Sequence, residues 1–364
     1  MLTQRKYRYT INGNKTGKEA GYFMKRALKI YLWPVWFLAL FGQAKSFKSN
    51  PIIGSKFLNF MGLHLIRVLA ARLSAHLRWL FLSAKMPRTL RQTYQRDGFV
   101  VLPDFLGAST LEALRAEIAA YEGPARQMLQ GNTATQRILL DDKALGGRPA
   151  LSRLAADNRL LDLLKYAGAK AVRPILYIQR IRNGVRDGNA DPQKKMHADT
   201  FHPTMKAWLF LEDVQEEDGP FTYVRGSHRM TWRRFKWEYK RSRVAAHIND
   251  GYSEKGSFRA SDADLAEMGL PAPEGLTAAA GTLVIANTNG FHGRGQARDG
   301  ANRIEIWAYS RHNPFSPWPG LGIKARAQLE HKILHAFWRR KDRTAAAKGG
   351  RASWHLIDAA DMLD

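Results

Sequence analysis

Residues 196–214 read MHADTFHPTMKAWLFLEDV, and the fold that we expect follows from this stretch and its surroundings. Its second half, residues 205–214, is a short apolar run, and the turn Asp218-Gly219-Pro220 follows it. Short apolar runs between turn residues are typical of buried strands. Further runs of this kind are found at residues 172–181, 221–224, 282–286 and 303–310.

The sequence before these runs has a helical pattern instead. Residues 99–102 (FVVL) predict one strand, and residues 109–112 (STLE) predict a capping box that opens a helix. A second amphipathic stretch covers residues 151–166, and the polar residues 229–275 predict a long excursion from the sheet. Helices followed by many short strands predict an α+β chain whose C-terminal half is an all-β barrel or sandwich.

The composition excludes several classes of protein. Of the 364 residues, 45% are hydrophobic and 11% aromatic, so the chain can bury a substantial core and is not intrinsically disordered. Cysteine is absent, which excludes disulfides, iron–sulfur clusters, thiolate zinc sites and a cysteine nucleophile. The net charge of +25 predicts an anionic partner or resting surface. No nucleic-acid-binding motif is present, so nucleic acid is not favoured as that partner.

Much of the positive charge lies at the N-terminus, where residues 1–90 hold 16 Lys and Arg and one acidic residue, Glu19. Residues 1–21 are polar and lack the apolar core of a secretory signal. Residues 31–41 (YLWPVWFLALF) are too short to cross a bilayer, and residues 57–82 predict a helix with interleaved cations. Two interpretations stay open: this region lies on an anionic membrane surface, or it is a helical subdomain that packs on the rest of the protein.

Three pieces of the strand-rich half carry the side chains of a metal site. His197 and Asp199 are two residues apart on an extended segment, so their side chains point the same way. His292 follows the strand predicted at residues 282–286, and Arg303 opens another strand eleven residues later. Two imidazoles and one carboxylate leave part of the ion open and form the facial triad of non-haem Fe(II) oxygenases. A guanidinium is a natural partner for the far carboxylate of a dicarboxylic co-substrate.

With these residues in place, the sequence from about Asp97 to His312 resembles the phytanoyl-CoA dioxygenase family of Fe(II)/2-oxoglutarate oxygenases. The resemblance rests on residues 98–103 (GFVVLP), 197–203 (HADTFHP), 226–228 (GSH), and 292–293 (HG) with Arg303. It implies a double-stranded β-helix (a cupin-like jelly roll) flanked by helices. It also implies that the catalytic residues His197, Asp199 and His292 bind Fe(II), that Arg303 binds 2-oxoglutarate, and that O2 is the second co-substrate.

The resemblance extends to side chains around the metal. Trp208 is similar to a tryptophan that contacts the co-substrate in the family, whereas Arg294 stands where the family often has a small or hydroxyl residue in that contact. Gln179, on the strand before the iron motif, is a further candidate for the co-substrate. For Lys206 and His228 the alternative roles are a solvated strand residue and a support for a turn. The candidates for substrate contact are His202, Lys206, Arg225 and His228.

We therefore predict a basic, aromatic-rich helical extension at residues 1–90, a dioxygenase domain at 91–320 and a basic helical tail at 321–364. The expected function is hydroxylation of an unactivated C–H bond of a lipid or lipid-linked substrate by a cytoplasmic protein at the inner membrane face. Because halogenating relatives lack the carboxylate found here as Asp199, hydroxylation or desaturation is favoured. One alternative is the same chemistry on a soluble anionic metabolite, such as an acyl-CoA or a phosphorylated or phosphonate compound. Another is a non-catalytic β-helix module that binds a membrane or a protein.

Overall fold

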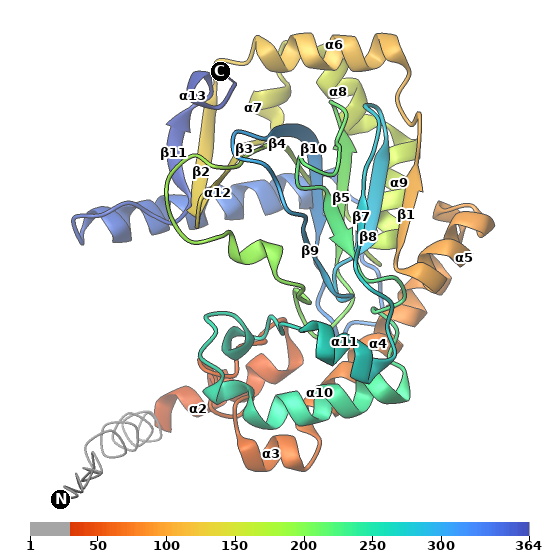
Figure 1. Ribbon diagram of the computed structural model, residues 1–364, viewed down its shortest axis with the longest axis vertical. Coiled ribbons are helices and arrows are strands. Elements are labelled where there is room, and N and C mark those ends of the chain that lie inside the picture. The colour runs from red at the N-terminus through yellow and green to blue at the C-terminus, as the bar shows by residue number, and fades with distance from the viewer. Residues whose placement is uncertain (1–29, 364) are drawn as a thin grey trace, which may run out of the picture.

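The computed structural model describes residues 30–363 and combines helices with a large antiparallel sheet (Figure 1). The expectations for residues 1–21 lie outside this range. Eight strands form one sheet in the order β1-β8-β5-β10-β4-β3-β2-β11, and three form a second sheet in the order β7-β6-β9. The strands are β1 (Phe99–Leu102), β2 (Pro124–Gln130), β3 (Thr133–Leu139), β4 (Ile175–Arg182), β5 (Met205–Phe210), β6 (Phe221–Tyr223), β7 (Glu274–Leu276), β8 (Leu283–Asn287), β9 (His292–Arg294), β10 (Asn302–Ser310) and β11 (His355–Asp358).

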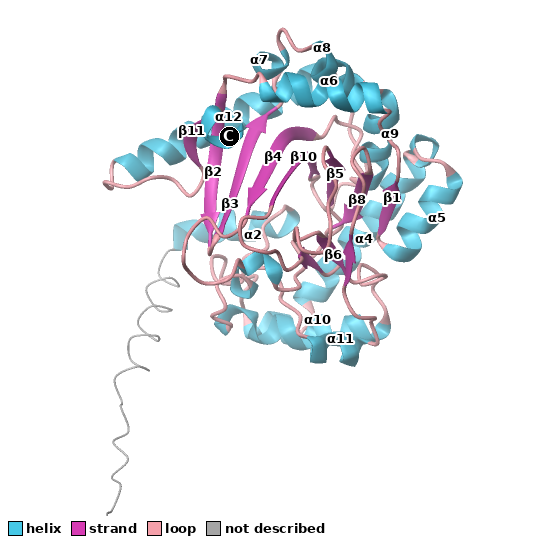
Figure 2. Cartoon of the chain, turned by 45° about the horizontal axis from the view of Figure 1, so that its top comes forward, coloured by secondary structure: helices cyan, strands magenta, loops and turns pink. Residues whose placement is uncertain are grey.

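Helices cover the sheets and form both ends of the described chain. In Figure 2, α6, α7 and α8 lie together at the top of the molecule, and α10 and α11 lie at the bottom. The helices are α2 (Trp33–Leu38), α3 (Lys56–Phe60), α4 (Leu63–Phe81), α5 (Arg88–Asp97), α6 (Ala108–Ala119), α7 (Asp142–Leu145), α8 (Pro149–Ala156), α9 (Asn158–Ala167), α10 (Trp232–Val244), α11 (Asp262–Met268), α12 (Lys324–Ala346) and α13 (Ala360–Leu363).

Alternation along the strands gives each face of the large sheet its own core. In β10, Ile306 belongs to the cluster that packs against α6, α8 and α9, whereas Trp307 belongs to the cluster on the other face. Trp307 pairs in register with Trp208 of β5 and Tyr177 of β4. This aromatic row packs against Phe221 of the small sheet, so the second core lies between the two sheets.

The apolar runs all form strands, with bounds that shift by a few residues. Strands β2, β3, β7, β9 and β11 were not expected, because their sequences are short or rich in polar residues. The predicted capping box is wrong, since α6 begins at Ala108 with Gly107 as an N-cap that makes no side-chain bond. The helix predicted at residues 151–166 is two helices, because Asp157 ends α8 and caps α9.

The described part of the N-terminal region packs on the core through both apolar and polar side chains, and Phe47, Val68 and Ala71 belong to its hydrophobic clusters. The helix predicted at residues 57–82 is divided into α3 and α4 by Gly62, which has a φ of +94°. From α4, His64 forms a buried hydrogen bond of 2.8 Å with Glu238 of α10, and Arg78 donates to the carbonyl of Ala169 at 2.9 Å. This is the packing expected of a helical subdomain. Between residues 30 and 363, no helix has the length and apolar character needed to cross a bilayer.

The last segments also differ from their predicted form. The excursion at residues 229–275 contains α10 and α11, and α10 packs against α3 and α4. The tail at residues 321–364 contains α12, which carries the basic run around Arg339, but it is not wholly helical. Its strand β11 pairs with β2 and extends the edge of the large sheet.

Candidate metal centre and active site

A cavity of about 270 Å³ lies against the face of the large sheet that carries the aromatic row. Side chains of β2, β3, β4, β5, β9 and β10 contribute to its walls. Eight of the eleven residues predicted for the site line this cavity: His197, Asp199, His292, Arg303, Trp208, Arg294, Gln179 and Lys206. The fold therefore brings together segments that are more than a hundred residues apart in the sequence.

Backbone pairing brings His197 and His292 together. His197 precedes β5 and His292 opens β9, and the two residues form an antiparallel bridge with reciprocal N–H···O bonds of 2.9 Å. Their rings consequently lie side by side, with centroids 4.4 Å apart. The backbone N–H of Asp199 donates to the carbonyl of Thr288 at 2.9 Å, which fixes the third residue beside them.

The three side chains fit a metal ion, because their ligand atoms all lie within 4.8 Å of one another. The Nδ1 of His197 donates to the carbonyl of Lys195 at 2.8 Å, and the Nδ1 of His292 donates to that of Gly290 at 2.9 Å. These bonds leave the Nε2 lone pairs for the cavity. The Nε2 of His292 is buried without a hydrogen-bond partner, a state that is rare in folded proteins. A metal ion held together with Asp199 would satisfy it.

Burial keeps both imidazoles neutral at pH 7. It holds the pKa of His197 well below its ordinary value and lowers the pKa of His292 to about 4. Burial alone would raise the pKa of Asp199, but Lys206 and the two imidazoles hold it well below the usual range. The site thus offers two neutral nitrogens and one carboxylate, which are the forms that bind a divalent metal ion.

The residues predicted to bind the co-substrate line the same cavity. Arg303 of β10 is buried, donates to the carbonyl of Gly219 and has its Nε 3.2 Å from Glu305. Glu305 was missed, although it lies two residues along the same strand and therefore on the same face. Trp208 stacks on Phe221 with ring centroids 4.0 Å apart, so it forms a flat apolar wall.

Gln179 and Arg294 are both engaged with other side chains. The amide of Gln179 donates to Glu305, and its carbonyl oxygen accepts from the Nε of Arg137 at 2.6 Å. Arg294 is paired with Asp191 at 2.5 Å, and both side chains are buried. The charge of Arg294 is therefore already balanced within the protein.

Arg137 of β3 is a cavity residue that the sequence analysis missed. Its guanidinium lies 3.7 Å from the ring centroid of Trp307 and 4.7 Å from that of Trp354. Burial lowers the pKa of Arg137 to about 10, so it is charged at neutral pH. Its hydrogen-bond partner is the neutral amide of Gln179. The sequence of β3, TATQRIL, gave no apolar signal that marked a buried strand here.

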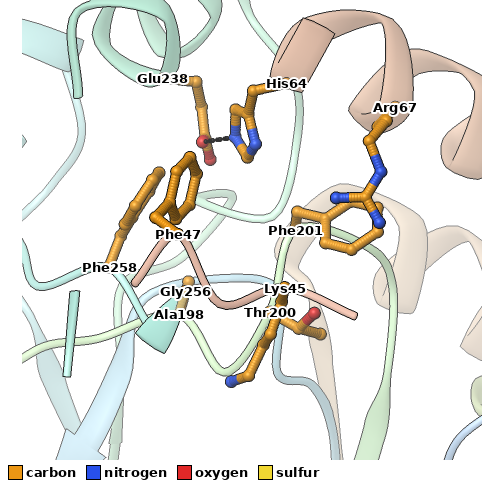
Figure 3. Close-up of a pocket in the computed structure, with 10 residues that line it drawn as sticks. All are labelled: Lys45, Phe47, His64, Arg67, Ala198, Thr200, Phe201, Glu238, Gly256 and Phe258. Carbon is orange, nitrogen blue, oxygen red and sulfur yellow. Dashed lines mark hydrogen bonds and ion pairs between the residues drawn. The ribbon is translucent and has the colours of Figure 1, made fainter. Parts of the chain in front are cut away.

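Lys45 reaches the centre from the N-terminal region and was also missed. Its ammonium donates to the backbone carbonyl of Asp199. Figure 3 shows Lys45 next to Thr200 in a small pocket between this region and the core, which Phe201 also lines. Burial lowers the pKa of Lys45 to about 8; Asp199 opposes this shift, and the neighbouring cations Arg311 and Lys206 add to it. No motif surrounds Lys45, because its role depends on how its segment packs.

Three residues predicted for substrate contact, His202, Arg225 and His228, do not line the cavity. Arg225 is half-exposed and forms an ion pair with Asp97 at 2.8 Å. The Nε2 of His228 bonds to the carbonyl of Gln95 at 3.1 Å. Burial lowers the pKa of both His202 and His228 to about 3, so both are neutral buried side chains. Their contact with substrate stays a prediction that the cavity does not support.

A sheet-lined cavity with two neutral imidazoles and one carboxylate defines the site of a mononuclear non-haem metal enzyme. The family model described as phytanoyl-CoA dioxygenase (PhyH) matches residues 94–303, and the chain belongs to this family. The protein is accordingly a dioxygenase that uses Fe(II), 2-oxoglutarate and O2, as the sequence predicted.

Individual relatives are more distant. The ectoine dioxygenases of Bordetella parapertussis and Bordetella bronchiseptica are 27% identical over 267 residues, which cover 65% of this chain and 79% of theirs. HygX from Streptomyces hygroscopicus, solved with nickel and 2-oxoglutarate bound, is 21% identical with a TM-score of 0.40, covering 62% of this chain and 87% of that one. The epimerase SnoN, solved with Fe3+, alpha ketoglutarate and nogalamycin RO, has the same identity and TM-score and is covered to 84%.

Proposed function

We propose that this dioxygenase hydroxylates an unactivated C–H bond of a lipid or lipid-linked substrate that carries an anionic group. The observation that carries the anionic group of the substrate is an excess of cationic side chains in and beside the cavity. The described chain also supports the three-part organisation proposed from the sequence, since helices precede β1 and follow β10. The predicted double-stranded β-helix is supported by the two sheets, which pack against each other.

His197, Asp199 and His292 are the proposed ligands of Fe(II), and the unpartnered Nε2 of His292 supports this assignment. With 2-oxoglutarate and O2, the bound metal supplies an oxidant that can remove hydrogen from an unactivated carbon. The chain's own side chains orient the target carbon and exclude water. The carboxylate of Asp199 favours hydroxylation or desaturation over halogenation.

Arg303 is the proposed clamp for the far carboxylate of 2-oxoglutarate. It is buried in the cavity wall, and a planar, permanently charged fork is suited to a carboxylate. Trp208 and Gln179 lie on the two strands that flank β10, so they supply an apolar wall and an amide on either side of the clamp. Arg294 is less suited to this role, because it is hydrogen-bonded to Asp191 at 2.5 Å, whereas the Nε of Arg303 lies 3.2 Å from Glu305 and makes no hydrogen bond.

The charges in this region do not balance without a further anion. Arg303 is paired with Glu305 and Arg294 with Asp191, and the charge of Fe(II) matches that of the 2-oxoglutarate dianion. Further cationic side chains remain in and beside the cavity, among them Arg137, Lys206, Lys45 and Arg259. Asp199 neutralises one of them. Because unpaired charges are costly to bury, we infer that the substrate supplies at least one anionic group.

The lipid form of the substrate is favoured by the apolar surface of α2, α3 and α4, described below. A soluble anionic metabolite, such as an acyl-CoA or a phosphorylated or phosphonate compound, is the second candidate. The cation excess favours this candidate equally, since it concerns the charged group alone.

Succinate formation can test the proposal. The full-length protein with Fe(II), 2-oxoglutarate and O2 is incubated either with a lipid extract or with the aqueous metabolite fraction of the same cells. We expect the lipid extract to raise succinate formation and to yield a product with one additional oxygen atom by mass spectrometry. Stimulation by the aqueous fraction alone would support the soluble candidate and overturn the lipid one.

Variants of the missed cations test the anionic group. Lys45→Met and Arg137→Gln should each lower the substrate-stimulated rate by roughly tenfold, because each removes a charge-assisted contact. The substrate-free rate of succinate formation should stay close to that of the wild type. Lys143→Met, at an exposed lysine of α7, is the matched control. Equal stimulated rates in all variants would contradict recognition of an anion at this position.

A further inference from the structure

Helix α4 is apolar on the side that faces solvent. Its inner side is mixed: Leu65, Val68, Ala71 and Ala75 are buried there beside Arg67 and Arg78, which donate to backbone carbonyls of other segments. Its outer side exposes large apolar side chains, with Leu73 63% and Leu80 58% accessible. A helix on the surface of a water-soluble domain normally carries polar side chains on its outer side.

The outer side of α4 is apolar along its whole length. Its exposed residues are Ile66, Leu69, Ala70, Leu73, Leu77, Leu80 and Phe81, together with His76. At 1.5 Å per residue, the 19 residues of α4 extend over about 28 Å. An apolar strip of this length exceeds the scattered exposed leucines that need no explanation.

Neighbouring elements add further exposed apolar side chains. Phe57, Phe60 and Met61 are exposed on and just after α3, immediately before α4. At the other end of α4, the ring of Phe81 contacts that of the exposed Trp318, with centroids 5.4 Å apart. The exposed aromatic residues of α2 precede α3 in the same N-terminal region (Figure 1). We name the exposed side chains of α3, α4 and Trp318 the apolar face.

Cations accompany the apolar face. No acidic residue occurs between Glu19 and Asp97, so α2, α3 and α4 carry no negative charge. Lys56 and Arg88 are exposed at the start of α3 and of α5. The guanidinium of Arg243 in α10 lies 5.3 Å from the ring centroid of the exposed Phe60. Bulky apolar side chains combined with cations are the signature of a surface that binds anionic lipid headgroups and the acyl region beneath them.

We propose that the apolar face docks on an anionic phospholipid bilayer, with α4 lying in the plane of the interface. The face lies on the membrane and does not cross it, in agreement with the absence of a bilayer-spanning helix among residues 30–363. A second copy of the chain fits less well, because a two-fold interface would bring cations of one sign together. This inference concerns the surface alone and holds whichever substrate the cavity accepts.

Vesicle flotation of the full-length protein tests the docking. We compare vesicles of phosphatidylcholine with vesicles that contain about one quarter phosphatidylglycerol, and we expect at least about tenfold tighter binding to the latter. The variant Leu69→Glu/Leu73→Glu should weaken that binding by at least about tenfold, because it places two carboxylates where apolar side chains enter the lipid. Binding should also fall with rising salt concentration.

The matched control is Ile333→Glu/Phe337→Glu, which changes two exposed apolar residues at the same spacing on α12. It should bind anionic vesicles like the wild type. Substrate-free succinate formation and the melting temperature establish that each variant is folded. Equal binding by both double variants, or no binding by the wild type, would overturn the proposal. The proposal would also be overturned if the wild type were a dimer and Leu69→Glu/Leu73→Glu dissociated that dimer without changing vesicle binding.

Discussion

The ammonium of Lys206 lies 2.7 Å from Asp199 and contacts the carboxylate oxygen Oδ2. The other oxygen, Oδ1, faces the imidazoles, 3.9 Å from the Nε2 of His197 and 3.7 Å from that of His292. One carboxylate thus serves a lysine and the metal position, each through its own oxygen. A metal ion bound to Oδ1 would be repelled by the ammonium on Oδ2, because both cations share one buried anion.

Lys206→Met should therefore tighten the binding of a divalent metal ion. We expect about a tenfold increase in affinity for Mn(II), used as a redox-stable probe, because the repulsion disappears. Calorimetric titration of the metal-free protein measures the effect, with Lys143→Met as the control. If Lys206 instead acts mainly by orienting Asp199, the affinity should fall by about ten- to a hundredfold, which would contradict this prediction.

His292→Ala should abolish the iron chelate. When Fe(II) and 2-oxoglutarate are added to the wild type without oxygen, we expect the weak visible charge-transfer band of the chelate. The variant should lose the band, since two ligands remain and the open cavity can no longer hold the metal. His76→Ala, at an exposed histidine of α4, should retain it. A wild type without the band at saturating metal would be inconsistent with the proposed centre.

Variants of Arg303 and of Arg137 should show that the two residues have different roles, the first in binding 2-oxoglutarate and the second in the response to substrate. We expect Arg303→Gln, combined with Glu305→Gln so that no buried carboxylate is left unpaired, to weaken 2-oxoglutarate binding by about thirtyfold. Metal binding should persist in this variant. Arg137→Gln should retain the chelate band with wild-type affinity and lose the response to substrate. The reverse pattern in the 2-oxoglutarate titration would show that Arg137 is the co-substrate clamp.

Glu238→Gln should change the acid limb of stability. Burial alone would raise the pKa of Glu238, but Arg234 and His64 lower it from 4.5 to about 2. In this pH range the folded state therefore binds fewer protons than the unfolded state. The contribution of Glu238 to the free energy of unfolding is fully present above about pH 4.5 and is lost as the pH falls towards 2. The shift corresponds to about 3 kcal/mol. Urea unfolding at several pH values in this window should show a flatter dependence in the variant, and an unchanged slope would disprove the pairing.

The parts of the fold that the sequence predicted are those with an apolar signal. Strands β5, β8 and β10 are buried on both faces, so their apolar runs are visible in the sequence. Strand β3 (TATQRIL) lines the cavity with Thr135 and Arg137, and these polar side chains conceal its buried position, whereas β2 (PARQMLQ) is only partly buried. The N-cap of α6 is Gly107, which makes no side-chain hydrogen bond, and not the serine of the predicted capping box.

The site divides in a similar way. His197, Asp199 and His292 were predictable because they occupy a recognisable motif at strand borders. Glu305 could have been predicted from the period of its strand, two residues beyond Arg303. Lys45 carries no such signal, because only the packing of its segment against the carbonyl of Asp199 brings it to the centre.

The family match at residues 94–303 contains all the proposed metal ligands, yet Lys45 precedes it and Trp354 follows it. Two segments outside the shared module thus complete the surroundings of the metal. A fragment trimmed to residues 94–303 would therefore end at the second residue of β10, and it would lose both Lys45 and Trp354 from around the metal.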